Sequence, residues 1–458
     1  MVEWDLFCFR HIRFQRGTPD CKEKSGQRVP FFGWERETPG MNHEAHRPGF
    51  PKLRLLDLRP YKDEEREGLL LIDRNGLFED PVFVPAELLP ILGALTGERD
   101  SREIAEDLGR EMGYKVPVSL VEQVVEMLDS KLCLEGERAE RASQERREAY
   151  LALDRRPALF PGTPGYPSDP ARLREELDRI LAEGAGVLGN GELRGLVAPH
   201  IDFARGREGY AAAYGRLFAE ERLPELLLVF GTGHAGPSTL LVPSTKDYET
   251  PLGALATDEE FVKQTLEAFP ELAAEEHLHE KEHSLEFQAV FLAHVFARHP
   301  SGAVPHCVFF LTGRLGEEPD EDPGVQGLLD FLEERVRASS KRTLLLAGAD
   351  LSHVGPVFGD AEPVDQDRVA RLEAADLADL EKARSLRLGD FVAGLQRAEA
   401  ERRVCGTTPI YLLGRLAQRL AGEGELEGRV LRYGASHEPG GGQCVTWASL
   451  AYEAGNRR

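Results

Sequence analysis

The chain has 458 residues, of which 41% are hydrophobic and 29% are charged, and its formal net charge is −23. This composition is typical of a globular protein with two or three domains. The excess of acidic residues argues against nucleic acid and anionic membrane surfaces as partners. No apolar run approaches the ~20 residues of a membrane span. Six cysteines without paired spacing favour reduced thiols in the cytoplasm.

Residues 1–50 are rich in arginine, glycine and proline and show no hydrophobic periodicity. They predict a disordered leader, in which Met41 is a second candidate for the translation start. The segment lacks the apolar core and the cleavage site of a secretory signal.

Residues 51–135 predict a small winged-helix-like α+β domain. Strand-like runs at 53–58, 68–76 and 81–85 are followed by helical patterns at 86–95, 101–113 and 118–136. The acidic composition disfavours a role in reading DNA. In the order of its elements the segment resembles the PqqD-like peptide-recognition domains of radical-SAM systems. A structural appendage without a binding role is the alternative interpretation.

Residues 136–170 predict a linker that consists of a charged helix and a turn-rich segment. From 171 to 458, apolar strand-like runs alternate with helical segments, which favours a three-layer α/β domain around a buried sheet. The strand candidates are 195–199, 226–231, 307–313, 343–350, 429–436 and 444–452. The helix candidates are 171–183, 206–219, 258–268, 284–298, 324–338, 363–377 and 408–420.

Side chains of the kind that bind metals follow three of these predicted strands. His200 ends LRGLVAPH, His234 ends LLLVFGTGH, and Asp350 and His353 end LLLAGADLSH. In an open α/β sheet, groups at the carboxyl ends of the strands gather in one crevice. A single histidine in such a place is usually structural, but the repetition favours a metal site.

Cys405 precedes the predicted helix at 408–420, where the helix N-terminus biases a thiol toward the thiolate, a better ligand or nucleophile. Asp350 is a candidate metal ligand or a carboxylate that orients a ligating imidazole, and a helix N-cap is its alternative role. His353 is a candidate ligand, general acid or base, or substrate contact.

Glu282 and His283 open the predicted helix at 284–298, and both are candidates to line the pocket as acid/base or hydrogen-bonding groups. Glu286 is alternatively a solvated acid in the first helical turn. The histidines of the polar stretch before this helix, His277 and His279, are expected to be exposed. His437 is a further candidate for the border of the pocket.

Six ordered motifs within 190–455 resemble the Memo family, whose prokaryotic members are named AmmeMemoRadiSam system protein B. They are VAPHIDF, GTGH, DYETPLG, EHSLEFQ, ADLSHVG and CGTTPI. The resemblance implies a fold similar to class III extradiol dioxygenases and a bound redox metal, iron or copper. It also implies a radical-SAM enzyme and an AMMECR1-like protein as partners.

For individual residues, the resemblance implies that His200, His234, Cys405 and Asp350 form the metal site and that His353 lies in the pocket. The chain departs from the family at Gly233, where serine is common. It also departs at 202–203, where a glycine–aromatic pair is common. These departures bear on the substrate more than on the metal.

Four functions follow from these residues. The first is a mononuclear iron(II) or copper redox enzyme with His353, His283 and Glu282 as catalytic groups and an unknown small-molecule or peptide substrate. The second is a zinc hydrolase, although no HExxH motif is present. The third uses Cys405 as a nucleophile with a histidine as its base. The fourth is a metal- or peptide-binding accessory protein without turnover.

Overall fold

The computed structural model describes residues 49–63, 65–73, 76–421 and 426–455. Residues 1–48 of the predicted leader, with Met41, lie outside the described residues. Within them, no helix is long and apolar enough to cross a membrane. The division of the chain into domains stays a prediction.

Residues 51–135 form a three-stranded antiparallel sheet followed by helices. The strands, in the order β1-β2-β3, are β1 (Asp57–Lys62), β2 (Glu67–Ile72) and β3 (Val82–Pro85). The helices are η2 (Ala86–Leu88), α1 (Leu89–Ala94), α2 (Ser101–Met112) and α3 (Val118–Ser130). Apolar side chains of the strands and of the helices bury a common core, which includes Leu71, Val84, Ile104, Val121 and Leu128. The second and third strands and the three helical patterns lie near the positions read from the sequence, whereas the first strand lies at Asp57–Lys62 and not at 53–58.

A helix, α4 (Glu137–Leu151), and a short strand, β4 (Arg155–Arg156), follow. β4 belongs to a small second sheet with β8 (Asp247–Thr250) and β9 (Gly253–Leu255).

The main sheet has eight strands in the order β12-β14-β5-β11-β6-β10-β7, with β13 paired to β14. The four central strands, β5, β11, β6 and β10, are parallel to one another. All seven residues of β6 are buried, because helices cover both faces of the sheet. The strands are β5 (Gly191–Ala198), β6 (Leu226–Thr232), β7 (Leu241–Pro243), β10 (His306–Thr312), β11 (Thr343–Gly348), β12 (Asp350–Val354), β13 (Leu426–His437) and β14 (Cys444–Gly455).

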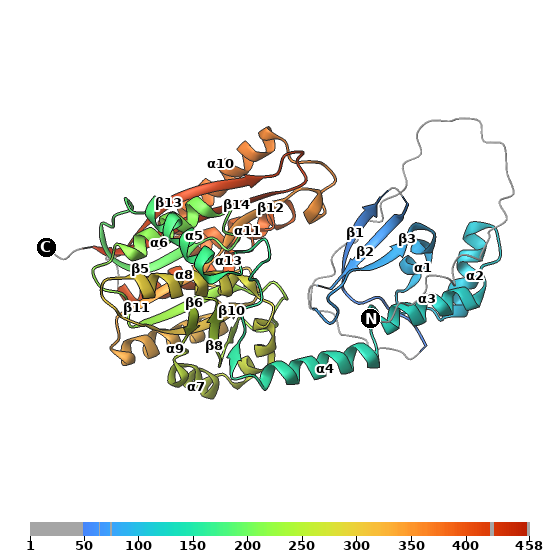
Figure 1. Cartoon of the computed structure of the whole chain (residues 1–458), viewed down its shortest axis with the longest axis horizontal. Helices are drawn as coiled ribbons and strands as arrows, with labels where there is room; N and C mark the ends of the chain where they lie inside the picture. Colours follow the sequence, from blue (N-terminus) through green and yellow to red (C-terminus); the bar gives the residue numbers. More distant parts are fainter. Residues whose placement is uncertain (1–48, 64, 74–75, 422–425, 456–458) are drawn as a thin grey trace. The chain divides into compact units, whose positions relative to one another are not determined.

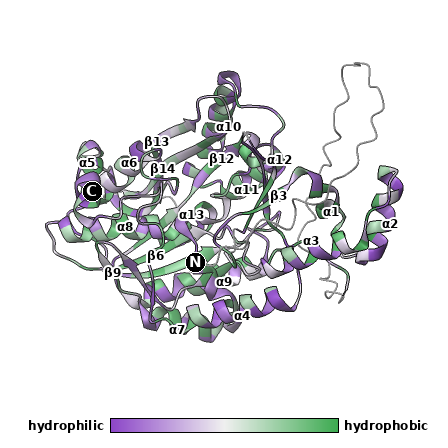
Figure 2. Cartoon of the chain, turned by 45° about the vertical axis from the view of Figure 1, so that its right-hand side comes forward, coloured by the Kyte–Doolittle hydropathy of each residue, from purple (hydrophilic) through white to green (hydrophobic). Residues whose placement is uncertain are grey.

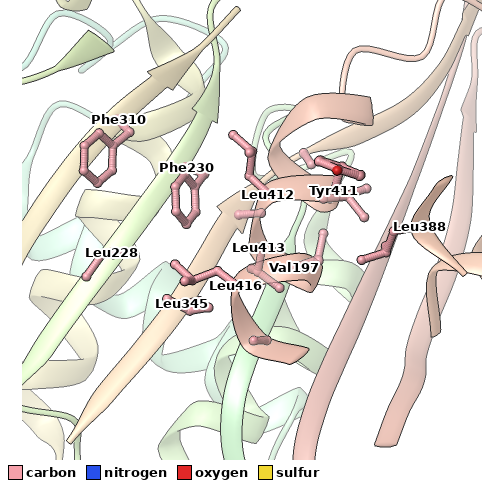
Figure 3. Packing of buried hydrophobic residues seen from close by; sticks show 14 of the residues in the cluster. Val197, Leu228, Phe230, Phe310, Leu345, Leu388, Tyr411, Leu412, Leu413 and Leu416 are labelled. Carbon is pink, nitrogen blue, oxygen red and sulfur yellow. The ribbon is translucent and has the colours of Figure 1, made fainter. Parts of the chain in front are cut away.

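Alternate residues of the central strands point into two separate cores. Leu228 and Phe230 pack with α13, whereas Leu227 and Val229 belong to the core that contains α5, α6 and α8. Figure 3 shows the first core, with Leu416 of α13 next to Leu345. The helices are α5 (Pro170–Glu183), α6 (Arg207–Phe218), α7 (Glu259–Ala268), η3 (Pro270–His279), α8 (His283–Arg298), α9 (Pro323–Ser339), η4 (Pro356–Phe358), α10 (Gln366–Arg384), α11 (Leu388–Arg397), α12 (Glu399–Arg402) and α13 (Thr407–Ala421).

The predicted mixed α/β architecture is confirmed, with helices on both faces of the main sheet (Figure 1). Figure 2 shows the two hydropathy patterns from which strands and helices could be distinguished in the sequence. The central strand β6 is coloured hydrophobic along its length, whereas α4 and α7 mix hydrophilic and hydrophobic residues. The short strands β7, β8 and β9 and the helix α11 were not among the sequence candidates. The segment that begins at Asp350 forms a further strand, β12, that was not among the sequence candidates either.

Candidate metal centre

The candidate residues come from chain segments at one edge of the main sheet. His200 follows β5 by two residues, His234 follows β6 by two residues, and Asp350 follows β11 by two residues. These strands are parallel neighbours, so their carboxyl ends meet at the same edge. His283 begins α8, and Cys405 lies two residues before α13. The topology therefore brings five separate segments to one place.

Three imidazoles form the centre of the cluster. His200, His234 and His283 each offer a ring nitrogen, and these nitrogens all lie within 4.8 Å of one another. The rings of His234 and His283 stack with centroids 4.7 Å apart, and the ring of His200 stands nearly perpendicular to both. Several nitrogen donors around one point are the arrangement that binds a transition metal.

His200 is held from its backbone side. Its Nδ1–H donates to the Gly348 carbonyl at 2.9 Å, which turns Nε2 toward the cluster. Nε2 lies 3.4 Å from the Cys405 Sγ and 3.7 Å from a carboxylate oxygen of Asp350, whose other oxygen accepts the His200 backbone N–H. Burial lowers the pKa of His200, but Asp350 and Cys405 outweigh it and raise that pKa to about 9.

His234 is oriented by Glu282. Its Nδ1–H donates to the Glu282 carboxylate at 2.9 Å, and its backbone N–H donates to the same carboxylate at 2.9 Å. Glu282 is also the N-cap of α8, because it accepts the Ser284 backbone N–H. Burial raises the pKa of Glu282, and the neighbouring His234 and His283 more than reverse this and hold it below its usual range. A carboxylate that fixes the tautomer of an imidazole is a regular partner of metal-binding histidines.

Cys405 and His353 complete the cluster on the side of Asp350. Burial raises the pKa of the Cys405 thiol, but His200 and His353 outweigh it and lower that pKa well below its usual range. The His353 Nδ1–H donates to the Leu351 carbonyl at 3.0 Å, and the ring contacts Phe358 edge-on. Asp350 opens a strand and no helix, so the N-cap role considered for it does not apply.

The cluster is closed on one side and open on the other. The side chains of His200 and Asp350 are each 2% exposed, whereas those of His234 and His283 are 37% and 33% exposed. A small molecule can therefore reach the centre past His234 and His283. A separate cavity of about 350 Å³, which lies along 162–169, shares none of the candidate residues.

Two interpretations of the residues around the start of α8 are wrong: a solvated Glu286 and an exposed His279. Glu286 is fully buried and forms an ion pair with Arg156, because residues 156–166 cover this face of α8. His279 is also fully buried: its Nε2–H donates to the Val242 carbonyl, and the Tyr248 hydroxyl donates to its Nδ1. His437 donates from Nε2 to the Val364 carbonyl and is not part of the imidazole cluster.

Sequence reasoning missed two groups that hold the site. The Gly348 carbonyl orients His200, and it carries no signal because every residue has a carbonyl. Arg156 binds the segment that leads into Glu282, and its neighbours Arg155 and Pro157 give it the appearance of an ordinary surface turn.

A comparison with known protein families agrees with this geometry. A family model described as Memo-like protein matches residues 156–451, which include every candidate site residue. The chain belongs to the Memo family. Relatives named MEMO1 family protein come from Aquifex aeolicus (strain VF5), 26% identical over 403 residues, and Methanopyrus kandleri, 26% identical over 300 residues. The first match covers 88% of this chain and 99% of the relative, and the second covers 63% and 96%.

The Aquifex match extends over 403 residues, more than this chain has from residue 156 to its end. It therefore includes part of the segment that precedes the Memo match. A third relative, from Thermotoga neapolitana, is 31% identical over 161 residues, which cover 35% of this chain and 53% of that protein.

Proposed function

We propose that this Memo protein is a mononuclear metal enzyme that carries out redox chemistry, with iron(II) or copper as the favoured metal. The observation that supports the proposal most directly is the convergence of three imidazoles whose donor nitrogens lie within 4.8 Å of one another. Two of these rings have a hydrogen bond on Nδ1 that directs Nε2 into the cluster. The donors fit a transition metal, since imidazole suits iron, copper and zinc and thiolate adds a preference for softer ions.

The proposed metal ligands are His200, His234 and Cys405, with Asp350 beside them as a ligand or as a carboxylate that orients His200. Cys405 Sγ lies 3.4 Å from the His200 donor nitrogen, so both can face one ion. His283 belongs to the same imidazole cluster and competes with Cys405 as the third ligand. A metal bound here would supply one-electron chemistry or a site for oxygen.

His353, His283 and Glu282 are the proposed catalytic groups. His283 and His353 both keep part of their rings accessible to solvent. His353 is proposed as the acid/base group. Burial and the neighbouring His234 lower the pKa of His283 to about 3, so His283 is proposed as a neutral hydrogen-bonding group, while Glu282 keeps His234 in one tautomer. The analogy with class III extradiol dioxygenases supports oxygen chemistry only at the level of the fold, and a fold does not determine a reaction.

The segment that precedes the Memo match is the proposed binding site for a partner. The sheet and helices at 57–130 fit a winged-helix-like module that binds a peptide, and we propose that it brings a substrate from a radical-SAM system that includes an AMMECR1-like protein. The substrate of the metal centre is a small molecule or a peptide.

The test is the metal content of the full chain after anaerobic purification, for the wild type and single alanine variants. We expect one iron or copper per chain, lost in His200→Ala and His234→Ala and retained in the control His437→Ala, because His437 is outside the cluster. Comparing Cys405→Ala with His283→Ala identifies the third ligand. Zinc in place of iron or copper would replace the redox proposal with hydrolysis, and the absence of any metal after reconstitution would refute the metal site.

A further inference from the structure

Arg156 is a fully buried arginine whose donors converge on the chain segment that leads into the metal centre. Its Nε–H donates to the His279 carbonyl at 3.1 Å, and its Nη2 donates to the carbonyls of Glu280 and Glu282 at 3.1 and 3.0 Å. Its Nη1 forms the ion pair with Glu286. A single guanidinium thus binds three backbone carbonyls within four consecutive residues and the first turn of α8.

The ion pair is also fully satisfied on its acidic side. The Glu286 carboxylate accepts the backbone N–H groups of Leu159 and Phe160 and the hydroxyl of Tyr166. The guanidinium additionally lies 5.2 Å from the centre of the Tyr248 ring. A buried ion pair adds little net stability, because desolvation offsets the attraction between the charges. We therefore look for the role of the pair in the residues that it holds in place.

The geometry indicates that role, because Glu282 is held at both of its ends. Its backbone carbonyl accepts from Arg156, and its carboxylate accepts from His234. Because His283 is the next residue, the direction of its side chain depends on the same backbone. Glu286 extends the effect to Phe160, whose ring contacts the His283 ring with centroids 5.8 Å apart.

We propose that Arg156 is a positioning residue of the metal centre, which fixes the backbone at 279–282 so that Glu282 and His283 meet His234 in the geometry that binds the metal. This inference rests on the proposed metal site. The planar fork of an arginine is required, because a lysine has no donors spaced to reach three carbonyls and a carboxylate at once.

The test replaces both members of the ion pair in the full chain, Arg156→Met with Glu286→Gln, so that no unpaired charge stays buried. The control is Arg216→Met with Glu453→Gln, which removes a buried ion pair between α6 and β14. The further partners of this pair, Glu220 and Arg429, are partly exposed to solvent, and neither belongs to 279–286. Circular dichroism and thermal unfolding establish that each protein is folded. Titration with Co²⁺, followed by its visible spectrum, then measures metal affinity and the geometry of the bound ion.

We expect the Arg156/Glu286 variant to bind Co²⁺ roughly 10–100-fold more weakly than the wild type, with an altered visible spectrum, as is typical when a group behind a metal ligand is lost. The Arg216/Glu453 control should bind as the wild type does. The single variant Arg156→Lys should lose affinity but keep more of it than the double variant. In a background that already carries Glu282→Gln, the Arg156/Glu286 change should have a smaller effect than in the wild type, because part of its action passes through the Glu282 carboxylate.

Wild-type affinity and spectrum in the folded Arg156/Glu286 variant would overturn the inference, and so would an equal loss in the Arg216/Glu453 control. A wild type that binds no metal would refute the proposed function instead. In that case the His234 Nδ1–H proton resonance of the metal-free proteins, identified by its loss in His234→Ala, still tests Arg156. Its unchanged presence in the Arg156/Glu286 variant would overturn the positioning role.

Discussion

Replacing Glu282 with glutamine should weaken metal binding without unfolding the protein. The two carboxylate oxygens of Glu282 accept three short hydrogen bonds, from the His234 ring, the His234 backbone and the Ser284 backbone, each at 2.9 Å. A glutamine has one oxygen and one NH₂ group in their place. Whichever way the amide turns, at least one of these donors faces an N–H group and loses its acceptor.

The magnitude follows from the two roles of the carboxylate. An amide is uncharged and a weaker acceptor than a carboxylate, so even an orientation that keeps the bond to the His234 ring makes this imidazole less basic. Metal affinity should therefore fall roughly 10–100-fold, or about 1.4–2.7 kcal/mol. As the N-cap of α8, its replacement should lower the free energy of unfolding by about 1 kcal/mol. The effect on affinity should therefore exceed the effect on folding.

The assay is competitive metal titration of the full chain against a chromophoric chelator, beside urea unfolding of the same samples. The control is Glu275→Gln, because Glu275 accepts the Ser238 and Thr239 backbone N–H groups of the loop after β6 but binds no imidazole. Glu282→Gln with the affinity of the wild type, or Glu275→Gln with an equal loss, would contradict the role of Glu282 in orienting His234.

Three further outcomes test other features of the fold and the site. Gly184→Ala should destabilise the protein by about 1–3 kcal/mol in urea unfolding, since its Cβ would collide with the backbone of α6, whereas Gly186→Ala, with open space around it, should not. Iodoacetamide at pH 7 should alkylate Cys405 of the metal-free protein before the buried Cys307, and peptide mapping measures the order. The reason is that the pKa of Cys405 is lowered whereas that of Cys307 is raised by burial. Burial lowers the pKa of His279 to about 3, below its unfolded value near 6.5, so the unfolded state binds the extra proton between these pH values. Stability should fall as the pH drops through this window, by up to ~1.4 kcal/mol per pH unit from this group, and His279→Gln should remove that part of the slope.

The main sheet could be predicted because its strands are continuous apolar runs. The residues 226–231 read as a buried strand, and the structure places β6 at Leu226–Thr232. The segment at 350–354 could not be read in the same way. It forms β12 because Asp350 and His353 pair with Trp447 and Val445 of β14, nearly a hundred residues away. Local sequence carries no signal for such a pairing.

The convergence of the site could be predicted for the same reason. Parallel strands end at one edge, so the residues after β5, β6 and β11 had to approach one another. For His283, the neighbouring sequence predicted only that it lies near the start of a helix, α8. That its ring stacks on His234 depends on how α8 packs against the sheet, which no spacing in the sequence expresses.

Glu286 shows how an argument from local sequence fails at a buried charge. An acid in the first turn of a helix is favoured by the helix dipole, and in an isolated helix it would be solvated. Here the segment that begins at Arg156 covers it, from about 130 positions earlier in the chain. The same local pattern therefore permits a solvated cap or a buried ion pair, and only the partner decides between them. Because that partner also binds the Glu282 carbonyl, the residue that decides the burial of Glu286 also holds the backbone of the metal centre.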